Sequence, residues 1–153
     1  MHEPQNLNNI QLNIKKIYKH WTDVTIRYSD QDPLGHVNNV AYAAYIEASR
    51  TMFIDDLLTR VNDLDVDFVL VSLKIDYLKE IRYPGTLSIG ASLIRLGTKS
   101  FSTGFGVFLN NDCVATSESI NVFFSLKNRK TVAIPQEARR LMTDNLIQQS
   151  KKI

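Results

Sequence analysis

The sequence has few of the features that mark secreted, membrane or nucleic-acid-binding proteins. Its single cysteine, Cys113, excludes an internal disulfide and a metal site made of paired cysteines. No apolar run approaches the roughly 18 residues of a membrane span, and the first nine residues have neither segment of a signal peptide. The 18 basic and 16 acidic residues nearly balance, which disfavours a nucleic-acid partner. We therefore expect a cytoplasmic protein with no nucleic-acid and no membrane partner.

Internal repeats, low-complexity tracts and linkers rich in proline or glycine are also absent. A length of 153 residues suits one domain with a single core. The 44% of hydrophobic residues and the net charge of +2 are typical of a globular chain. The first 20 residues keep no steady apolar period, so we expect an N-terminal arm over 1–20 and a single domain over 21–153.

The patterning of that domain predicts an α+β fold. Val24–Tyr28 alternate as in a half-buried strand, and the turn-rich loop over Asp30–Asn39 leads into a helix that ends near Leu58. Either Asn38 or Asn39 can cap this helix, which is apolar nearly all round its first turns and must be enclosed. A final short helix is expected to begin at Pro135, to run through Ile147 and to end in a frayed Lys151-Lys152. Four more strands are expected at Phe68–Tyr77, Thr86–Leu96, Ser100–Leu109 and Cys113–Ser125. One long central helix wrapped by a curved antiparallel sheet satisfies this order.

The loop and helix carry a motif that resembles a known family. The run Arg27–Asn39 reads RYSDQDPLGHVNN and is followed by Tyr42, Tyr45, Glu47 and Arg50. It resembles the hotdog-fold acyl-CoA thioesterases, in the branch named for 4-hydroxybenzoyl-CoA thioesterase. The segment Gly97–Phe101 gives a second match to the family, and the order of elements agrees over about residues 22–126. The resemblance implies the hotdog fold and hydrolysis of an acyl thioester to a free acid and coenzyme A.

The catalytic residue that the resemblance implies is Asp32. A carboxylate at the mouth of a helix N-terminus can act as general base for water or attack the thioester carbon itself. The first helical amides, at about Asn39 to Ala41, can polarise the thioester carbonyl and stabilise the oxyanion. The reaction requires no metal and no organic cofactor. Asp30 is more simply explained as a residue that holds the loop backbone.

The residue that assists Asp32 in catalysis is left open by the sequence. Some relatives have a histidine where this chain has Asn39, so either Asn39 or His36 is a candidate for that role. Glu47 is a reserve candidate for the base, although its spacing to Arg50 also suits an ion pair on the helix. Candidates for contact with the substrate are the first helical residues, the tyrosines of the helix and the hairpin at 99–100: Val40, Ala41, Tyr42, Tyr45, Lys99 and Ser100.

The resemblance also implies a homodimer or homotetramer, with the active sites between chains. The substrate is an acyl-CoA or an acyl carrier protein thioester, and its acyl group stays open. Two alternatives remain. An enoyl-thioester hydratase or dehydratase on the same fold fits poorly, because the spacing from Asp30 or Asp32 to His36 differs from its motif. A non-catalytic domain that binds acyl thioesters would keep the fold and lose turnover.

Overall fold

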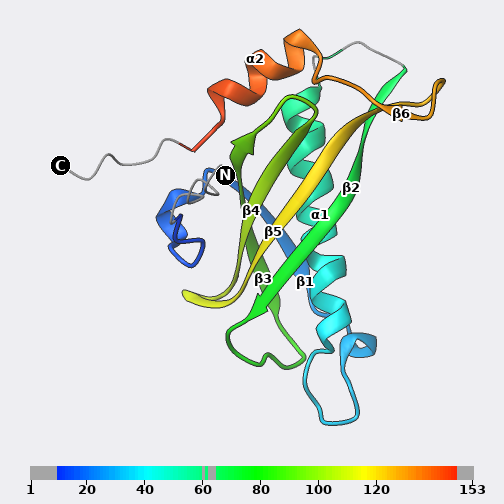
Figure 1. Ribbon diagram of the computed structural model, residues 1–153. Helices are drawn as coiled ribbons and strands as arrows, with labels where there is room; N and C mark the ends of the chain where they lie inside the picture. Colours follow the sequence, from blue (N-terminus) through cyan, green and yellow to red (C-terminus); the bar gives the residue numbers. More distant parts are fainter. Residues whose placement is uncertain (1–9, 60, 62–64, 148–153) are drawn as a thin grey trace, which may run out of the picture.

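The computed structural model describes residues 10–59, 61 and 65–147 of the chain. Its sheet curls around one long helix, and a short second helix covers one end of the molecule (Figure 1). The helices are η1 (Lys15–Ile17), η2 (Tyr28–Asp30), α1 (Asn39–Leu58) and α2 (Gln136–Asp144), of which η1 and η2 are 3₁₀-helices. The strands are β1 (His20–Thr25), β2 (Val66–Tyr77), β3 (Thr86–Leu96), β4 (Ser100–Leu109), β5 (Asp112–Ser125) and β6 (Lys130–Thr131).

The strands form one antiparallel sheet in the order β1-β3-β4-β5-β2, and the two-residue β6 pairs with β5. Two hairpin connections, β3–β4 and β4–β5, give β3, β4 and β5 their consecutive places, while β1 and β2 form the two edges. The helix α1 lies on the concave face of this sheet (Figure 1). This arrangement is the hotdog fold, so the predicted α+β class and central helix are confirmed.

The core forms between α1 and the concave face. Tyr42, Ile46 and Ile54 of α1 are almost fully buried. Alternate residues of the central strands meet them, because successive side chains of a strand point to opposite faces of a sheet. Among these strand residues are Leu87, Ile89, Leu93, Phe101, Phe105 and Val107. Burial of this apolar surface holds α1 in place and thereby fixes the position of its N-terminus.

The first predicted strand was placed too late in the chain. β1 covers His20–Thr25, whereas Tyr28 lies in η2 with 76% of its side chain exposed. The Arg27 N–H leaves the ladder because it donates to the Asp30 carboxylate, which turns the chain into η2. Local bonding by an aspartate side chain therefore overrides an alternating pattern at this point.

The final helix is also shorter than predicted. α2 ends at Asp144, and Leu146 instead forms a parallel bridge with Leu93. The Ile147 N–H donates to the carbonyl of Leu93 in β3. The chain therefore leaves the helix to form hydrogen bonds with the sheet. The short strand β6 was not predicted. Lys151 and Lys152, expected as a frayed end of this helix, lie outside the described residues.

The described part of the N-terminal arm, residues 10–19, packs on the sheet at three glycines. A Cβ atom at Gly90 would collide with the Tyr18 ring, and one at Gly104 would lie 2.5 Å from a Leu12 methyl group. The Tyr18 hydroxyl donates to the Leu12 carbonyl, and only 5% of the Tyr18 surface is exposed. The glycines thus provide a trough that the arm fills.

Candidate active site

The loop between η2 and α1 holds Asp32 in a defined orientation. Its Oδ1 accepts hydrogen bonds from the backbone N–H groups of Leu34 (2.9 Å) and His36 (3.1 Å). Its own N–H donates to the His36 carbonyl at 2.8 Å, and Gly35 turns the loop with a positive φ of 81°. Within the described chain, Oδ2 of Asp32 has no hydrogen-bond partner. One carboxylate oxygen is therefore anchored, and the other is available to water or substrate.

The loop ends at the N-terminus of α1, which Asn38 caps. The Asn38 Oδ1 accepts from the Val40 N–H at 3.0 Å, and its carbonyl accepts from the Ala41 N–H at 2.9 Å. Of the three amides predicted to meet the substrate, only that of Asn39 has no partner among the described residues. This amide lies at the N-terminus of a 20-residue helix, which is the positive end of the helix dipole. Asn39 is exposed, and its carbonyl accepts from the Tyr77 hydroxyl at 3.0 Å.

His36 is braced by two side chains from the connection between β2 and β3. Its Nδ1 lies 2.9 Å from the Glu80 carboxylate, and the Arg82 guanidinium donates to its Nε2 at 2.9 Å. Because Arg82 has only donors, Nε2 is the acceptor and Nδ1 carries the proton. Both ring nitrogens are thus engaged away from Asp32. Glu80 and Arg82 were missed at the sequence level, since no motif connects residues so far apart along the chain.

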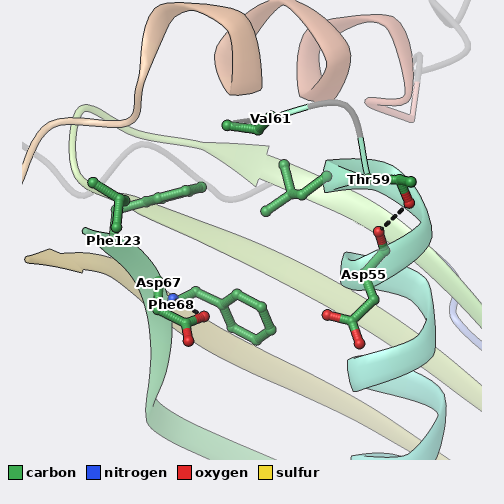
Figure 2. Close-up of a pocket in the computed structure, with 8 residues that line it drawn as sticks. Asp55, Thr59, Val61, Asp67, Phe68 and Phe123 are labelled. Carbon is green, nitrogen blue, oxygen red and sulfur yellow. Dashed lines mark hydrogen bonds between the residues drawn. The ribbon is translucent and has the colours of Figure 1, made fainter. Parts of the chain in front are cut away.

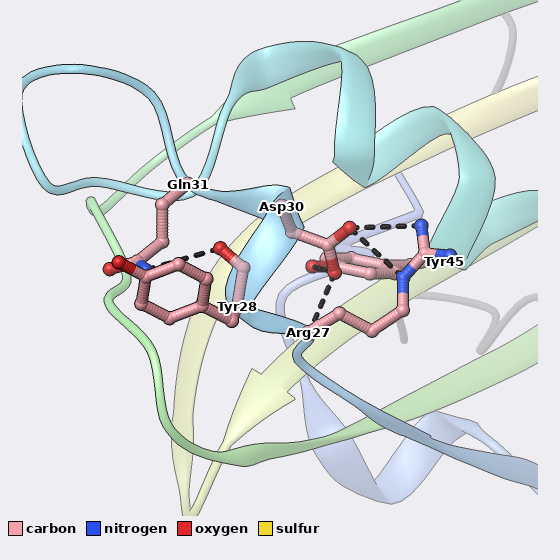
Figure 3. A network of polar contacts seen from close by, with 5 residues as sticks. All are labelled: Arg27, Tyr28, Asp30, Gln31 and Tyr45. Carbon is pink, nitrogen blue, oxygen red and sulfur yellow. Dashed lines mark hydrogen bonds and ion pairs between the residues drawn. The ribbon is translucent and has the colours of Figure 1, made fainter.

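Asp30 and Tyr45 are buried, and Asp30 forms a hydrogen-bond network with Tyr45 and with the mainly exposed Arg27 (Figure 3). The Tyr45 hydroxyl donates to Oδ2 at 2.6 Å, and the Arg27 N–H donates to the same oxygen at 2.9 Å. The Arg27 guanidinium donates to Oδ1 at 2.9 and 3.1 Å. Burial alone would raise the pKa of Asp30, but the hydrogen bonds from Tyr45 and Arg27 hold that pKa below its usual range. Burial and the neighbouring carboxylate raise the pKa of Tyr45.

The helix residues expected at the substrate divide into two groups. Tyr42 and Tyr45 are 2% and 3% exposed and pack in the core, where Tyr42 meets the Tyr77 ring edge-on at 5.1 Å. Val40 is 76% exposed, and Ala41 is half-buried behind it. Val40 is therefore the side chain of this group that lies open beside the Asn39 amide.

Lys99 and Ser100 lie at the opposite end of the sheet from Asp32. Thr86, the first residue of β3, pairs with Thr25 just before the Asp32 loop. The Lys99 turn follows the other end of this 11-residue strand, about 33 Å away at 3.3 Å per residue. Within one chain, the fold does not bring the Lys99 hairpin to Asp32.

A cavity of about 330 Å³ lies at the C-terminal end of α1 (Figure 2). Its walls are mainly apolar, and Asp55, Thr59 and Asp67 add polar atoms. The apolar walls come from α1, β2, β5 and the connection after α1: Leu58, Val61, Val66, Phe68 and Phe123. Leu58 is 19 residues after Asn39, so the cavity is about 28 Å from the N-terminus of α1 at 1.5 Å per residue. No part of the sequence pattern had indicated it.

The residues that the structure describes contain no cluster of three or more histidine, cysteine or acidic side chains placed to hold a metal ion. None of their helices has the length and apolar character needed to cross a membrane.

Comparison with known proteins places this geometry in a family. The protein PA5185 of Pseudomonas aeruginosa is 27% identical and superimposes with a TM-score of 0.76 over 86% of this chain and 94% of its own. A predicted thioesterase from Bacillus stearothermophilus is 23% identical, with a TM-score of 0.76 over 85% of this chain and 98% of its own. The protein SAV2348 of Staphylococcus aureus, in complex with CoA, is 12% identical, with a TM-score of 0.75 over 87% and 89%. Residues 26–142 match the family described as the thioesterase-like superfamily. The chain therefore belongs to the thioesterase-like superfamily and has its hotdog fold.

Proposed function

We propose that the protein hydrolyses an acyl-CoA thioester to a free acid and CoA at the Asp32 loop. The observation that carries this proposal is that two polar groups at the two ends of one short loop, Oδ2 of Asp32 and the N–H of Asn39, have no hydrogen-bond partner in the part of the chain that the structure describes. The CoA bound to the S. aureus relative supports CoA as the carrier. Membership of the superfamily supports thioester hydrolysis as the class of reaction.

The chemistry follows from these two groups. Asp32 either takes a proton from water, whose oxygen attacks the thioester carbon, or attacks that carbon itself to form an anhydride that water then cleaves. The carbonyl oxygen gains negative charge in both routes, and the Asn39 N–H with the helix dipole stabilises it. The C–S bond then breaks, and the thiolate of CoA leaves and takes up a proton. The Asn39 side chain is exposed beside this position and is suited to orient the water.

The proposal leaves His36 in a supporting role. Proton transfer by His36 would require a free ring nitrogen, whereas Glu80 and Arg82 occupy both. The same bonds count against an enoyl-thioester hydratase, which uses a histidine in its loop. His36 instead holds the loop that carries Asp32 against the connection between β2 and β3.

A second chain completes the proposed site. The edge strand β2 exposes the consecutive apolar residues Val69, Leu70 and Val71, and an exposed apolar strand edge favours pairing with another chain. Antiparallel pairing of two β2 edges would place opposite ends of the two sheets side by side. The Lys99 turn and the cavity of one chain would then lie next to the Asp32 loop of the other. In this homodimer Lys99 and Ser100 meet the phosphates of CoA, and the apolar cavity receives an apolar acyl chain.

The activity is tested by release of free thiol from a panel of acyl-CoAs, from acetyl to palmitoyl and including 4-hydroxybenzoyl. We expect turnover of one acyl class and none of the water addition to crotonyl-CoA that a hydratase would catalyse. Absence of thiol release from every member would refute the proposal and favour a binding domain. The same panel with thioesters of acyl carrier protein tests the carrier.

The shared site is tested by combining two defective chains. Leu58→Trp fills the cavity and should move the preference towards shorter acyl chains. When the Leu58→Trp and Asp32→Asn dimers are dissociated and mixed, long-chain turnover should return. Each mixed dimer has one site in which one chain contributes an intact Asp32 and the other contributes an intact cavity. Random mixing makes half of the dimers mixed, so recovery approaches about one quarter of the wild-type rate. No recovery, with a confirmed mixed dimer, would refute the shared site.

A further inference from the structure

Asp30 is a buried carboxylate that the proposed reaction does not use. It is 5% exposed, and donors from Arg27 and Tyr45 occupy both of its oxygens. An ionised carboxylate is costly to bury unless hydrogen bonds replace its hydration. The chain therefore has a carboxylate that is costly to bury just two residues before Asp32, where an apolar residue would fill the space at a lower cost in free energy.

The bonds of Asp30 connect the three segments that build the active site. Its carboxylate joins Arg27, which lies between β1 and η2, to Tyr45, in the second turn of α1. Its carbonyl accepts from the N–H of Asn38, the cap residue of α1, at 2.8 Å. One residue thus holds the start of the loop, the cap and the body of the helix at the same time.

We propose that Asp30 and Tyr45 are positioning residues that set the distance between the Asp32 carboxylate and the Asn39 N–H. This inference rests on the proposed function. Asp32 follows Asp30 by two residues, and Asn39 follows Asn38 directly, so the loop between the two reacting groups is fixed at both ends by Asp30. Tyr45 adds the only hydrogen bond from the body of α1 to that carboxylate within the described chain. A displacement of about 1 Å between such groups is enough to cost about 100-fold in rate.

Asp30 itself is not the base. Its oxygens are buried and fully engaged, whereas Oδ2 of Asp32 has no hydrogen-bond partner among the described residues. The two neighbouring carboxylates therefore have different roles: Asp30 orients the loop, and Asp32 reacts. Arg27, which is mainly exposed, closes the outer side of Asp30 with two donors of one guanidinium.

The test is Tyr45→Phe, which removes one hydroxyl and keeps the ring in the core. We expect kcat to fall about 10-fold to 100-fold, because the loop shifts relative to the helix, while KM changes little. Tyr18→Phe is the matched control. It also removes a buried tyrosine hydroxyl, but this one donates to the Leu12 carbonyl and lies in the arm on the glycine trough. It should lower thermal stability to a similar extent and leave kcat unchanged.

Arg27→Lys supplies a second variant that cannot fail through loss of the core, because the Arg27 side chain is 69% exposed. It keeps the charge and loses the two-donor geometry, so a smaller fall in kcat is expected. Equal kcat for Tyr45→Phe and Tyr18→Phe at equal loss of stability would overturn the inference and leave Asp30 a purely structural residue. A wild-type protein without thioesterase activity would instead refute the proposed function, so the two failures are distinguishable.

Discussion

The contact between the arm and the glycine trough gives a prediction whose size can be worked out from the structure. In Gly90→Ala, the new Cβ would lie 2.6 Å from Cδ2 and 2.7 Å from Cβ of Tyr18. These atoms are near the base of the side chain, so rotation of Tyr18 cannot relieve the contact. Overpacking of this kind costs about 1–3 kcal/mol. Release of Tyr18 from the trough would instead lose the free energy of burying its aromatic ring, about 3 kcal/mol, and that of its hydrogen bond, about 1 kcal/mol.

The protein takes whichever response costs less, strain or release, so the expected loss in the free energy of unfolding is about 1–3 kcal/mol. Gly104→Ala is the matched control, because its Cβ would meet the far end of Leu12, a methyl group that can move. It should cost about 1 kcal/mol or less. Denaturant unfolding measures both values, and tryptic cleavage after Lys15 or Lys16 reports whether the arm has left the sheet.

A double-mutant cycle with Tyr18→Ala checks the mechanism. If the Tyr18 ring causes the loss, Gly90→Ala should cost much less in the Tyr18→Ala background than in the wild type. A Gly90→Ala protein within about 0.5 kcal/mol of the wild type, or one no worse than Gly104→Ala, would refute the close packing of the arm. Thiol release should persist in all of these variants, since the trough is remote from Asp32.

Three further predictions concern the active-site loop. Asn38→Ala should lower the free energy of unfolding by about 1 kcal/mol through loss of the cap on Val40, and an unchanged denaturation midpoint would contradict the cap. His36→Gln should keep kcat within about tenfold of the wild type, because a brace contributes less than the 100-fold or more of acid–base catalysis; a larger loss would return His36 to a catalytic role. The lowered pKa of Asp30 stabilises the fold at all pH values above its unfolded value of about 3.9, and this stability is lost as the pH falls through the lower folded value. Asp30→Asn should therefore weaken the acid dependence of unfolding, and an unchanged pH profile would show that Asp30 is not linked to folding.

Strong local patterns made much of the fold predictable from the sequence. β3 and β4 have the predicted bounds, and α1 begins at Asn39 with Asn38 as its cap. The alternating apolar residues and the tight turns between these strands are local signals, which is why they could be read directly. β1 was misplaced because the Asp30 carboxylate bends the chain at a point where the apolar alternation continues.

The site was predictable only where it is contiguous in sequence. Asp32, Asn38 and Asn39 belong to one motif, and the structure places all three in the same loop and helix start. Glu80 and Arg82 reach His36 from a distant connection, and no periodicity indicates such a contact. The separation of Lys99 from Asp32 depends on the length and direction of β3, which the motif does not contain.

The central claim is that the free oxygen of Asp32 carries the chemistry, and the most direct test is kcat of Asp32→Asn. The asparagine keeps the size of the side chain and can still accept the two loop hydrogen bonds, but it has no charge. Asp144→Asn, an exposed change on α2, is the matched control. We predict a loss of at least about 100-fold for Asp32→Asn on the best acyl-CoA, with the control unchanged. Equal activity of the wild type and Asp32→Asn would contradict the account and move the catalytic role away from Asp32.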